Sequence, residues 1–484
     1  MRILALLVLT WGAVPEVFAQ TGANVFSEIW TVPYSQYGQS DQFANSLTQL
    51  ANGTIVAGGG DGYQMNVCGQ IGGAWLVAVD ASGANVWQRL DADCAGASQV
   101  ASVIRATKGG GFVLAGGDGS NPACYGCAWL ARLTNAGGIA WQEDLTTFFL
   151  SAISGIRQTP DGGYIAVGNV TPATTYAQEG LVMKLSAAGA LEWSQLYAET
   201  ADSFPGALAD GPLVFRSVAP TPDGGYVVSG VAEAHFSVYA NVLLVAKLDP
   251  QGNIQWSNVY FSSTWGSGAP GDSQYAIFPA ANGGYMLSGV AGTIAYPFAK
   301  LFLLMKLDST GRPVWQTGYG ALNGIFNVSV GTSAYATPDG GYVLAGTSDA
   351  FLSGPYEYYT GWMLKTDATG NILWQKVYEG EPQQNTQFGD VIRTADGGYA
   401  AAGYSYVGSP AYGGPGFFVI KTDSTGAIGN CACVEDTSSS PLRLNLSSYT
   451  ATFSLDTSQV SLSAVTNIRG KPTNVTPIVL YPGN

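Results

Sequence analysis

The stretch "TPDGGYVLAG" (337–346) occurs again with few changes as "TPDGGYIAVG" (159–168) and "TPDGGYVVSG" (221–230). Looser copies are "ANGGYMLSGV" (281–290) and "TADGGYAAAG" (394–403). The residue that follows this turn, after two glycines in every unit but the first, recurs at intervals of 57, 52, 62, 59, 57 and 57 residues. A period of this length predicts a repeat architecture, in which each copy is one small structural unit. The seven anchor positions are Ile55, Phe112, Tyr164, Tyr226, Tyr285, Tyr342 and Tyr399.

A second phrase follows each of the first six anchors, as in "LDSTGRPVW" (307–315), where a glycine precedes a tryptophan by four residues. Each copy has four short runs of β-branched and aromatic residues, separated by turn residues, which is the pattern of four strands. One such sheet cannot bury both of its faces alone, whereas seven sheets around an axis can. The tryptophans are Trp87, Trp141, Trp193, Trp256, Trp315 and Trp374.

The seventh copy, "TDSTGAIGN" (422–430), has Asn430 where tryptophan is expected. Trp30 lies 23 residues before Gly53, just as Trp374 lies 23 residues before Gly397. We therefore expect an N-terminal strand to complete the last four-stranded blade and to close the ring. The predicted fold is all-β, a seven-bladed β-propeller over residues 24–433 with a short β or irregular tail at 434–484.

Composition supports this fold class and narrows the functions. The chain has 484 residues with 65 glycines, 12% aromatic residues and only 11% charged residues, which suits strands joined by tight turns. Its net charge of −14 argues against binding to nucleic acid or anionic membranes.

The first nineteen residues have the pattern of a secretory signal peptide, with Arg2 before an apolar core and small Val17 and Ala19 before Gln20. The apolar run is too short to span a membrane. We expect an exported protein, extracellular or periplasmic, which is compatible with association with the cell surface.

Six cysteines fit an oxidising compartment, where disulfides are stable. The first pairings to consider are Cys68–Cys94 and Cys124–Cys127, while Cys431 and Cys433 pair with each other or elsewhere. The "CYGC" stretch (124–127) also has the form of a redox motif or of half a zinc site, but zinc would need a second such motif, none exists, and His235 is the only histidine. We expect no metal.

The repeat resembles that of a group of bacterial exported propeller proteins, with the form "T-DGGYI-AG…KTD–GN–W". The strand layout is similar, more distantly, to the quinoprotein-like and outer-membrane assembly-factor propellers. The resemblance covers all seven units and implies the fold without implying one function. A quinoprotein would also need a calcium site and usually adjacent cysteines, neither of which the sequence shows, so we expect no cofactor.

Residues repeated in every unit are interpreted as scaffold. An isolated aspartate before two glycines favours an Asx-type turn over a calcium loop, which needs several oxygen ligands. Each tryptophan is expected to pack between neighbouring blades. The basic residue before each second turn is expected to lay its stem along the blade and to pair with nearby acids. The aspartates are Asp161, Asp223, Asp339 and Asp396, and the basic residues are Arg132, Lys184, Lys247, Lys306, Lys365 and Lys421.

The two regular turns of each unit are expected on one face of the ring. Function is expected on the other face, where the loops differ from blade to blade. Three of these loops, from units four to six, would form an aromatic and acidic patch suited to a glycan or a protein. The alternative is that these side chains cover the channel mouth and bury themselves. The candidate residues are His235, Phe236, Tyr239, Trp265, Asp272, Tyr356, Glu357, Tyr358 and Tyr359.

The leading hypothesis is a non-enzymatic exported binding or scaffold protein, with no catalytic residue assigned. A second hypothesis is a glycoside hydrolase or lyase, because two loop carboxylates would suffice for that chemistry. A third is a cell-surface assembly or filament subunit joined through the tail, which could form a hairpin, a spacer or a strand donated to a partner. The loop carboxylates are Asp202, Glu233, Asp272, Glu357, Glu379 and Glu381.

Overall fold

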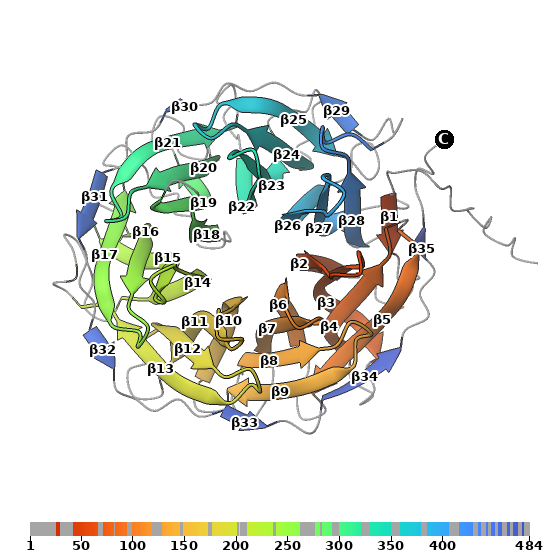
Figure 1. The fold of residues 1–484 in the computed structure, drawn as a ribbon, viewed down its shortest axis with the longest axis horizontal. Helices are drawn as coiled ribbons and strands as arrows, with labels where there is room; N and C mark the ends of the chain where they lie inside the picture. The colour runs from red at the N-terminus through yellow and green to blue at the C-terminus, as the bar shows by residue number, and fades with distance from the viewer. Residues whose placement is uncertain are drawn as a thin grey trace, which may run out of the picture.

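The structure is a computed structural model that describes residues 26–29, residues 42–428 with gaps in the loops, and seven short strands between 434 and 478. Its described residues form strands and turns without a helix. Seven antiparallel sheets stand around a central axis (Figure 1). The expected all-β, seven-bladed propeller is confirmed.

The blades follow one another in chain order, each running from an inner strand beside the axis to an outer strand at the rim. Blade 1 consists of β2 (Gln42–Gln49), β3 (Ile55–Met65), β4 (Ile71–Val79) and β5 (Asn85–Asp93). Blade 2 consists of β6 (Gln99–Ala106), β7 (Phe112–Asp118), β8 (Ala128–Leu133) and β9 (Ile139–Leu145). Blade 3 consists of β10 (Phe149–Gln158), β11 (Tyr164–Thr171), β12 (Glu179–Leu185) and β13 (Leu191–Ala198).

The remaining blades repeat this order. Blade 4 consists of β14 (Leu213–Pro220), β15 (Tyr226–His235), β16 (Tyr239–Leu248) and β17 (Ile254–Phe261). Blade 5 consists of β18 (Ala276–Pro279), β19 (Tyr285–Gly292), β20 (Lys300–Leu307) and β21 (Pro313–Tyr319). Blade 6 consists of β22 (Ser329–Ala336), β23 (Tyr342–Ser348), β24 (Thr360–Thr366) and β25 (Ile372–Tyr378). Blade 7 consists of β26 (Thr386–Arg393), β27 (Tyr399–Ser405), β28 (Gly416–Thr422) and β1 (Phe26–Ile29).

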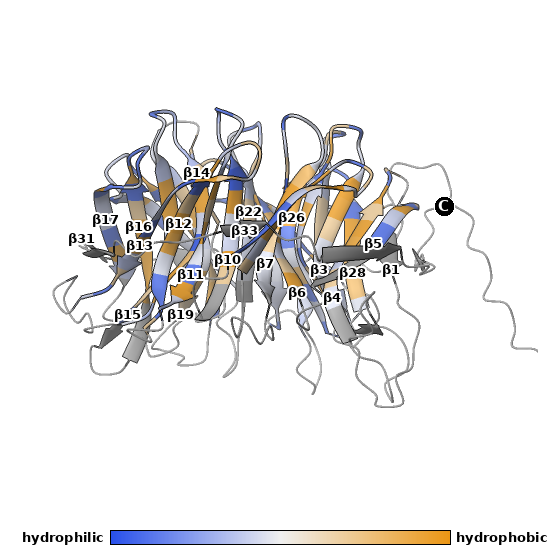
Figure 2. Cartoon of the chain, turned by 90° about the horizontal axis from the view of Figure 1, so that it is seen from below, coloured by the Kyte–Doolittle hydropathy of each residue, from blue (hydrophilic) through white to orange (hydrophobic). Residues whose placement is uncertain are grey.

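The core lies between the blades. Seven clusters of buried apolar side chains each join the strands of two neighbouring blades, so every joint of the ring has one cluster. At the joint between blades 7 and 1, the rings of Trp75 and Phe417 lie 4.9 Å apart. Apolar residues run along the strands and hydrophilic residues occupy the turns (Figure 2). The ring is therefore held by the burial of apolar surface at each joint.

The N-terminal strand β1 pairs antiparallel with β28, with Phe26 opposite Ile420 and Ile29 opposite Phe417. This pairing gives blade 7 its fourth strand. Trp30, on which the expectation of this strand rested, lies outside the described residues.

The repeated tryptophan packs against the repeated glycine of the next blade, as expected for a scaffold residue. Gly311 of blade 5 has a φ of +82°, and a Cβ placed on it would lie 2.5 Å from the ring of Trp256 in blade 4. The hydroxyl of Tyr260 in blade 4 also donates to the carbonyl of Gly311, at 2.5 Å. Only glycine fits both the backbone angle and the close contact. The glycines that face a tryptophan in this way are Gly137, Gly189, Gly252, Gly311, Gly370 and Gly426.

Gly311→Ala is expected to destabilise the protein more than Gly162→Ala. Both glycines have positive φ, but a Cβ on Gly162 would meet nothing within 4 Å. The Gly162 variant therefore measures backbone strain of about 1 kcal/mol alone, whereas the Gly311 variant adds overpacking of about 1–3 kcal/mol. Chemical denaturation of both variants tests this difference, and equal midpoints would contradict the tryptophan–glycine contact.

The C-terminal tail forms a belt around the ring, defined here as β29–β35. The belt follows the rim backwards from blade 6 to blade 1 and then reaches blade 7 (Figure 1). Its strands pair antiparallel with β25, β21, β17, β13, β9, β5 and β1 in turn. They are β29 (Val434–Asp436), β30 (Leu442–Arg443), β31 (Ser447–Thr450), β32 (Ser454–Asp456), β33 (Leu462–Ala464), β34 (Ile468–Pro472) and β35 (Pro477–Ile478).

The belt corrects the expectation of a hairpin or a spacer for residues 434–484. Its strands pair with the outer strands of their own ring, which makes each sheet five-stranded. An outer strand without this partner would present unpaired backbone groups to other chains. The period of the propeller repeat does not extend into the tail, so the sequence pattern gave no sign that the tail would visit every blade.

Candidate functional site

The two ends of the ring differ. The turns within each unit, from first to second strand and from third to fourth, lie together on one end, here called the turn face. The connections from second to third strand, and from one blade to the next, lie on the other end, here called the loop face. Function was expected on the loop face, and the structure also shows polar residues that line a cavity at the centre of the ring.

The repeated aspartate of the turn face is confirmed as a scaffold residue. Asp161 accepts hydrogen bonds from the Thr159 hydroxyl and from the backbone N–H of Gly163, the latter at 3.0 Å. Lys184, only 5% exposed, forms an ion pair with Asp161 at 2.9 Å. The bonds from Thr159 and Lys184 lower the pKa of Asp161 to about 2. Asp223, Asp339 and Asp396 form the same pair with Lys247, Lys365 and Lys421.

Three of the predicted loop-face residues lie within the described part of the chain. His235 ends β15 and stands opposite Tyr239, the first residue of β16. The backbone N–H of Tyr359 donates to Asn385 at 2.7 Å, and its carbonyl accepts the N–H of Thr386 at 2.7 Å. Blade 5 separates the His235–Tyr239 pair from Tyr359, so these residues come from blades that are not adjacent.

The other predicted residues lie outside the described residues, so their roles stay predictions. They are Phe236, Trp265, Asp272, Tyr356, Glu357 and Tyr358 for the ligand, and Cys68, Cys94, Cys124, Cys127, Cys431 and Cys433 for the disulfides.

Residues that interrupt the repeat gather along the channel, on the inner strands. One position of the inner strand, two residues before the first turn of the blade, is neutral in blades 1, 4, 5, 6 and 7. The same position is Arg105 in β6 of blade 2 and Arg157 in β10 of blade 3. Their side chains and those of the other inner strands line a cavity of about 380 Å³, part of it open to solvent. All seven inner strands contribute to this lining. Sequence reasoning missed this cluster because it compared the loops and not the inner strands.

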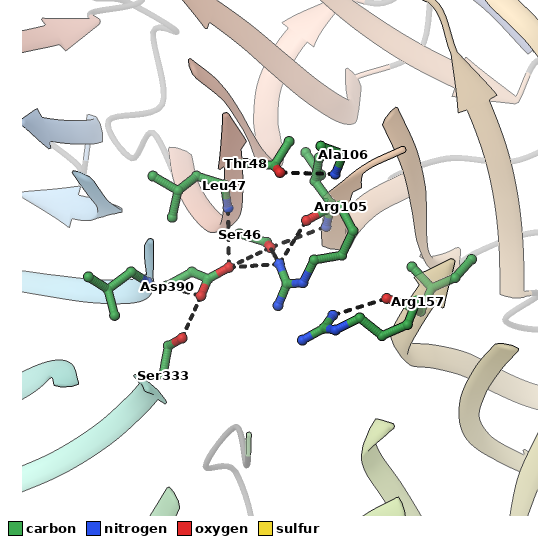
Figure 3. A network of polar contacts seen from close by, with 11 residues as sticks. Ser46, Leu47, Thr48, Arg105, Ala106, Arg157, Ser333 and Asp390 are labelled. Carbon is green, nitrogen blue, oxygen red and sulfur yellow. Dashed lines mark hydrogen bonds and ion pairs between the residues drawn. The ribbon is translucent and has the colours of Figure 1, made fainter. Parts of the chain in front are cut away.

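Asp390 of β26 is the centre of a hydrogen-bond network (Figure 3). Its carboxylate accepts hydrogen bonds from the hydroxyls of Ser46 and Ser333, at 2.8 and 2.5 Å, and from Nη1 of Arg105 at 2.9 Å. The backbone N–H of Leu47 adds a contact at 3.3 Å. The side chain is 5% exposed, and its partners belong to blades 6, 1 and 2. This carboxylate ties four blades together at the axis.

Arg157 differs from Arg105 in having no carboxylate partner among the described residues. Its one hydrogen bond within the described part of the chain runs from Nη1 to the carbonyl of Ile156, at 3.0 Å. Burial and the neighbouring charge of Arg105 lower the pKa of Arg157 to about 9. Figure 3 shows its guanidinium extending toward the same central space as that of Arg105. The channel therefore holds a guanidinium that has no ion-pair partner among the described residues, although the charge of Asp390 partly offsets its own.

A pair of carboxyl groups lies at the joint between blades 3 and 4. Glu199 follows β13 and is 1% exposed, while Glu233 lies near the end of β15. Burial raises the pKa of Glu199 to about 8, and the charge of Glu233 adds to the rise. Glycoside hydrolysis requires a carboxyl group with a raised pKa beside a second carboxylate. A carboxyl group as enclosed as that of Glu199 cannot contact a sugar in this conformation. Glu199 was not among the sequence candidates.

Glu199→Gln is expected to make the protein more stable at pH 8 and to leave it unchanged near pH 4. Because the folded-state pKa of about 8 exceeds the ordinary 4.5, the folded protein holds a proton that the unfolded chain releases. The free energy of unfolding of the parent protein therefore falls as pH rises through this window, by at most about 1.4 kcal/mol per pH unit. Urea denaturation at pH 4, 6 and 8 tests this, and equal pH slopes in both proteins would contradict it.

Comparisons with known proteins leave the family open. No family model matches the chain, and no curated protein matches it. Among solved structures, the chain is similar to a protein of unknown function from Dyadobacter fermentans DSM 18053, with 9% identity and a TM-score of 0.41. The match covers 82% of this chain and 98% of the other.

The described residues contain no cluster of three or more histidine, cysteine, aspartate or glutamate side chains placed to hold a metal ion. In the same part of the chain, no helix has the length and apolar character needed to cross a membrane.

Proposed function

We propose that this chain is an exported, non-enzymatic binding or scaffold protein that holds a glycan or a protein on its loop face. The propeller fold is compatible with such a role, because it presents many loops from one rigid ring. The proposal that the protein is exported rests on the signal-peptide pattern of residues 1–19.

The observation that carries the proposal is the unequal length of the paired hairpins that reach toward the loop face. In blade 6 the hairpin of second and third strands ends at the pair Ser348–Thr360. In blade 4 the equivalent pair is Ala232–Val242, and three further pairs follow. At about 3.4 Å per residue, the paired strands of this hairpin are roughly 10 Å longer than those of blade 6. Paired hairpins of unequal length give this face a contour that suits a ligand larger than a metabolite.

The tip of this hairpin carries candidate residues. His235 and Tyr239 form its last pair. Tyrosine and histidine offer both an apolar ring and a hydrogen-bonding group, which suits stacking on a sugar or packing on a protein.

Two observations favour binding over catalysis. The channel carboxylate Asp390 accepts at least four hydrogen bonds, one of them from its ion-pair partner Arg105, so protein donors already occupy its oxygens. The raised carboxyl of Glu199 is enclosed in a blade joint. The assembly alternative is less favoured, because the described tail strands pair within their own chain.

A glycan-array screen of the full secreted chain tests the proposal, with Tyr239→Ala as the variant. Leu373→Ala is the matched control, because Leu373 is 59% exposed on an outer strand near the turn face. Loss of an aromatic anchor is expected to weaken binding at least tenfold, or about 1.4 kcal/mol, while the control binds like the parent.

If no glycan binds, the same three proteins are used to capture partners from the extracellular fraction. Binding to a protein that depends on Tyr239 supports the proposal in its protein form. Hydrolysis of any array glycan, or binding that Leu373→Ala weakens as much as Tyr239→Ala, would overturn it.

A further inference from the structure

We propose that the centre of the ring is a second binding site, for an oxyanion such as the carboxylate or phosphate group of a small molecule. The site lies between the arginines of β6, β10 and β14. It does not depend on the loop-face proposal, because it uses the inner strands and not the loops.

The charge of the cavity is the first argument. Among the described residues of its lining, the two neighbouring arginines Arg105 and Arg157 face one carboxylate, that of Asp390. Asp390 is already engaged by Arg105. The whole chain carries a net charge of −14, so this positive centre is opposite in sign to the protein around it. A low-dielectric channel concentrates such a field on the ligand that enters it.

The unused hydrogen-bond donors are the second argument. Arg157 offers five N–H groups, and one of them is bonded within the described residues. The bonds that Arg105 makes there all start from Nη1, which leaves Nη2 and Nε. Ser102 and Ser154 line the same cavity with hydroxyls that make no hydrogen bond to described residues. Donors without acceptors, on neighbouring strands, are the complement of an oxyanion.

The geometry of the inner strands brings these groups together. Each of β6, β10 and β14 contains a register shift, after Ala101, Ile153 and Phe215 respectively. The extra residue at this shift is Ser102 in blade 2, Ser154 in blade 3 and Arg216 in blade 4. A bulge of this kind turns a side chain out of the regular alternation. In all three blades that side chain lies in the cavity lining.

The identity of the ligand class follows from the donors. A guanidinium group matches carboxylate and phosphate through two parallel hydrogen bonds, and it stays charged at neutral pH. An unpaired guanidinium in a half-enclosed cavity destabilises the fold, and a bound anion would remove that effect. The empty space of about 380 Å³ at the centre of the ring includes open solvent, so these donors can be reached by an anion from solution.

The test is thermal denaturation and calorimetric titration of the full chain with inorganic phosphate and, separately, citrate. Sodium chloride at equal ionic strength is the reference. Both anions are expected to raise the melting temperature in a saturable way, since a ligand of the folded state stabilises it by mass action. Stronger binding of phosphate indicates an inorganic or phosphorylated ligand, and stronger binding of citrate indicates an organic acid; both outcomes support the site.

Arg157→Gln is the decisive variant, and Arg393→Gln on the inner strand of blade 7 is its control, because Arg393 lies outside the cavity lining. Arg157→Gln is expected to weaken anion binding at least tenfold. Without anion, the melting temperature of this variant is expected to equal or exceed that of the parent protein. A merely structural arginine would lower that temperature when replaced. The proposal is overturned if neither anion exceeds the chloride reference, or if Arg157→Gln responds to them like the parent.

Discussion

Replacing Asp390 with alanine is expected to lower the free energy of unfolding by about 3–5 kcal/mol, the usual cost of breaking a buried ion pair by removing one partner. The carboxylate accepts hydrogen bonds from Ser46, Ser333 and Arg105, which belong to three other blades. Without it, Arg105 joins Arg157 as a second unpaired cation at the axis. The effect on stability comes from four blades losing a shared partner.

Urea denaturation measures this loss, with two variants as controls. Asp390→Asn keeps the shape of the side chain and an acceptor oxygen for one serine, but it removes the charge. Its free energy of unfolding is therefore expected to lie between those of the parent and the alanine variant. Asp249→Ala removes a turn carboxylate that bonds only local groups and is expected to cost under about 1 kcal/mol. An alanine variant at Asp390 that unfolds like Asp249→Ala would show that the network does not hold the ring together.

Ending the chain at residue 433 is expected to convert the protein into larger, concentration-dependent species. This truncation removes the belt and exposes the outer edge of each blade, and unpaired edges recruit strands from other molecules. The amides of the outer strands that face the belt are expected to exchange with solvent at least tenfold faster, while those of the inner strands keep their protection.

Sedimentation velocity and hydrogen exchange measure the two effects. A chain that ends at residue 478 is the control, because it keeps every described belt strand and removes only the six residues after β35. It is expected to behave like the full chain. If the chain ending at 433 keeps both the size and the exchange pattern of the full chain, the belt does not protect the edges.

The sequence by itself determined the fold and its scaffold residues. The period of the glycine pairs predicted seven blades, because a unit that cannot bury its own sheet must pack against copies of itself. The aspartate turns, their lysine partners and the tryptophan series were each predicted from repetition. A residue that recurs from blade to blade contributes to the structure that the blades share. Contacts such as Asp161–Lys184 and Trp256–Gly311 confirm these predictions.

The tertiary structure decided what repetition does not encode. Asp390, Arg105 and Ser333 lie hundreds or tens of residues apart and meet only because the ring brings its inner strands to one axis. The sequence did not predict the belt either, because its strands pair through backbone hydrogen bonds, which require almost no side-chain pattern. Local pattern thus determined each blade, whereas closure of the ring created the charged centre and the edges that the belt covers.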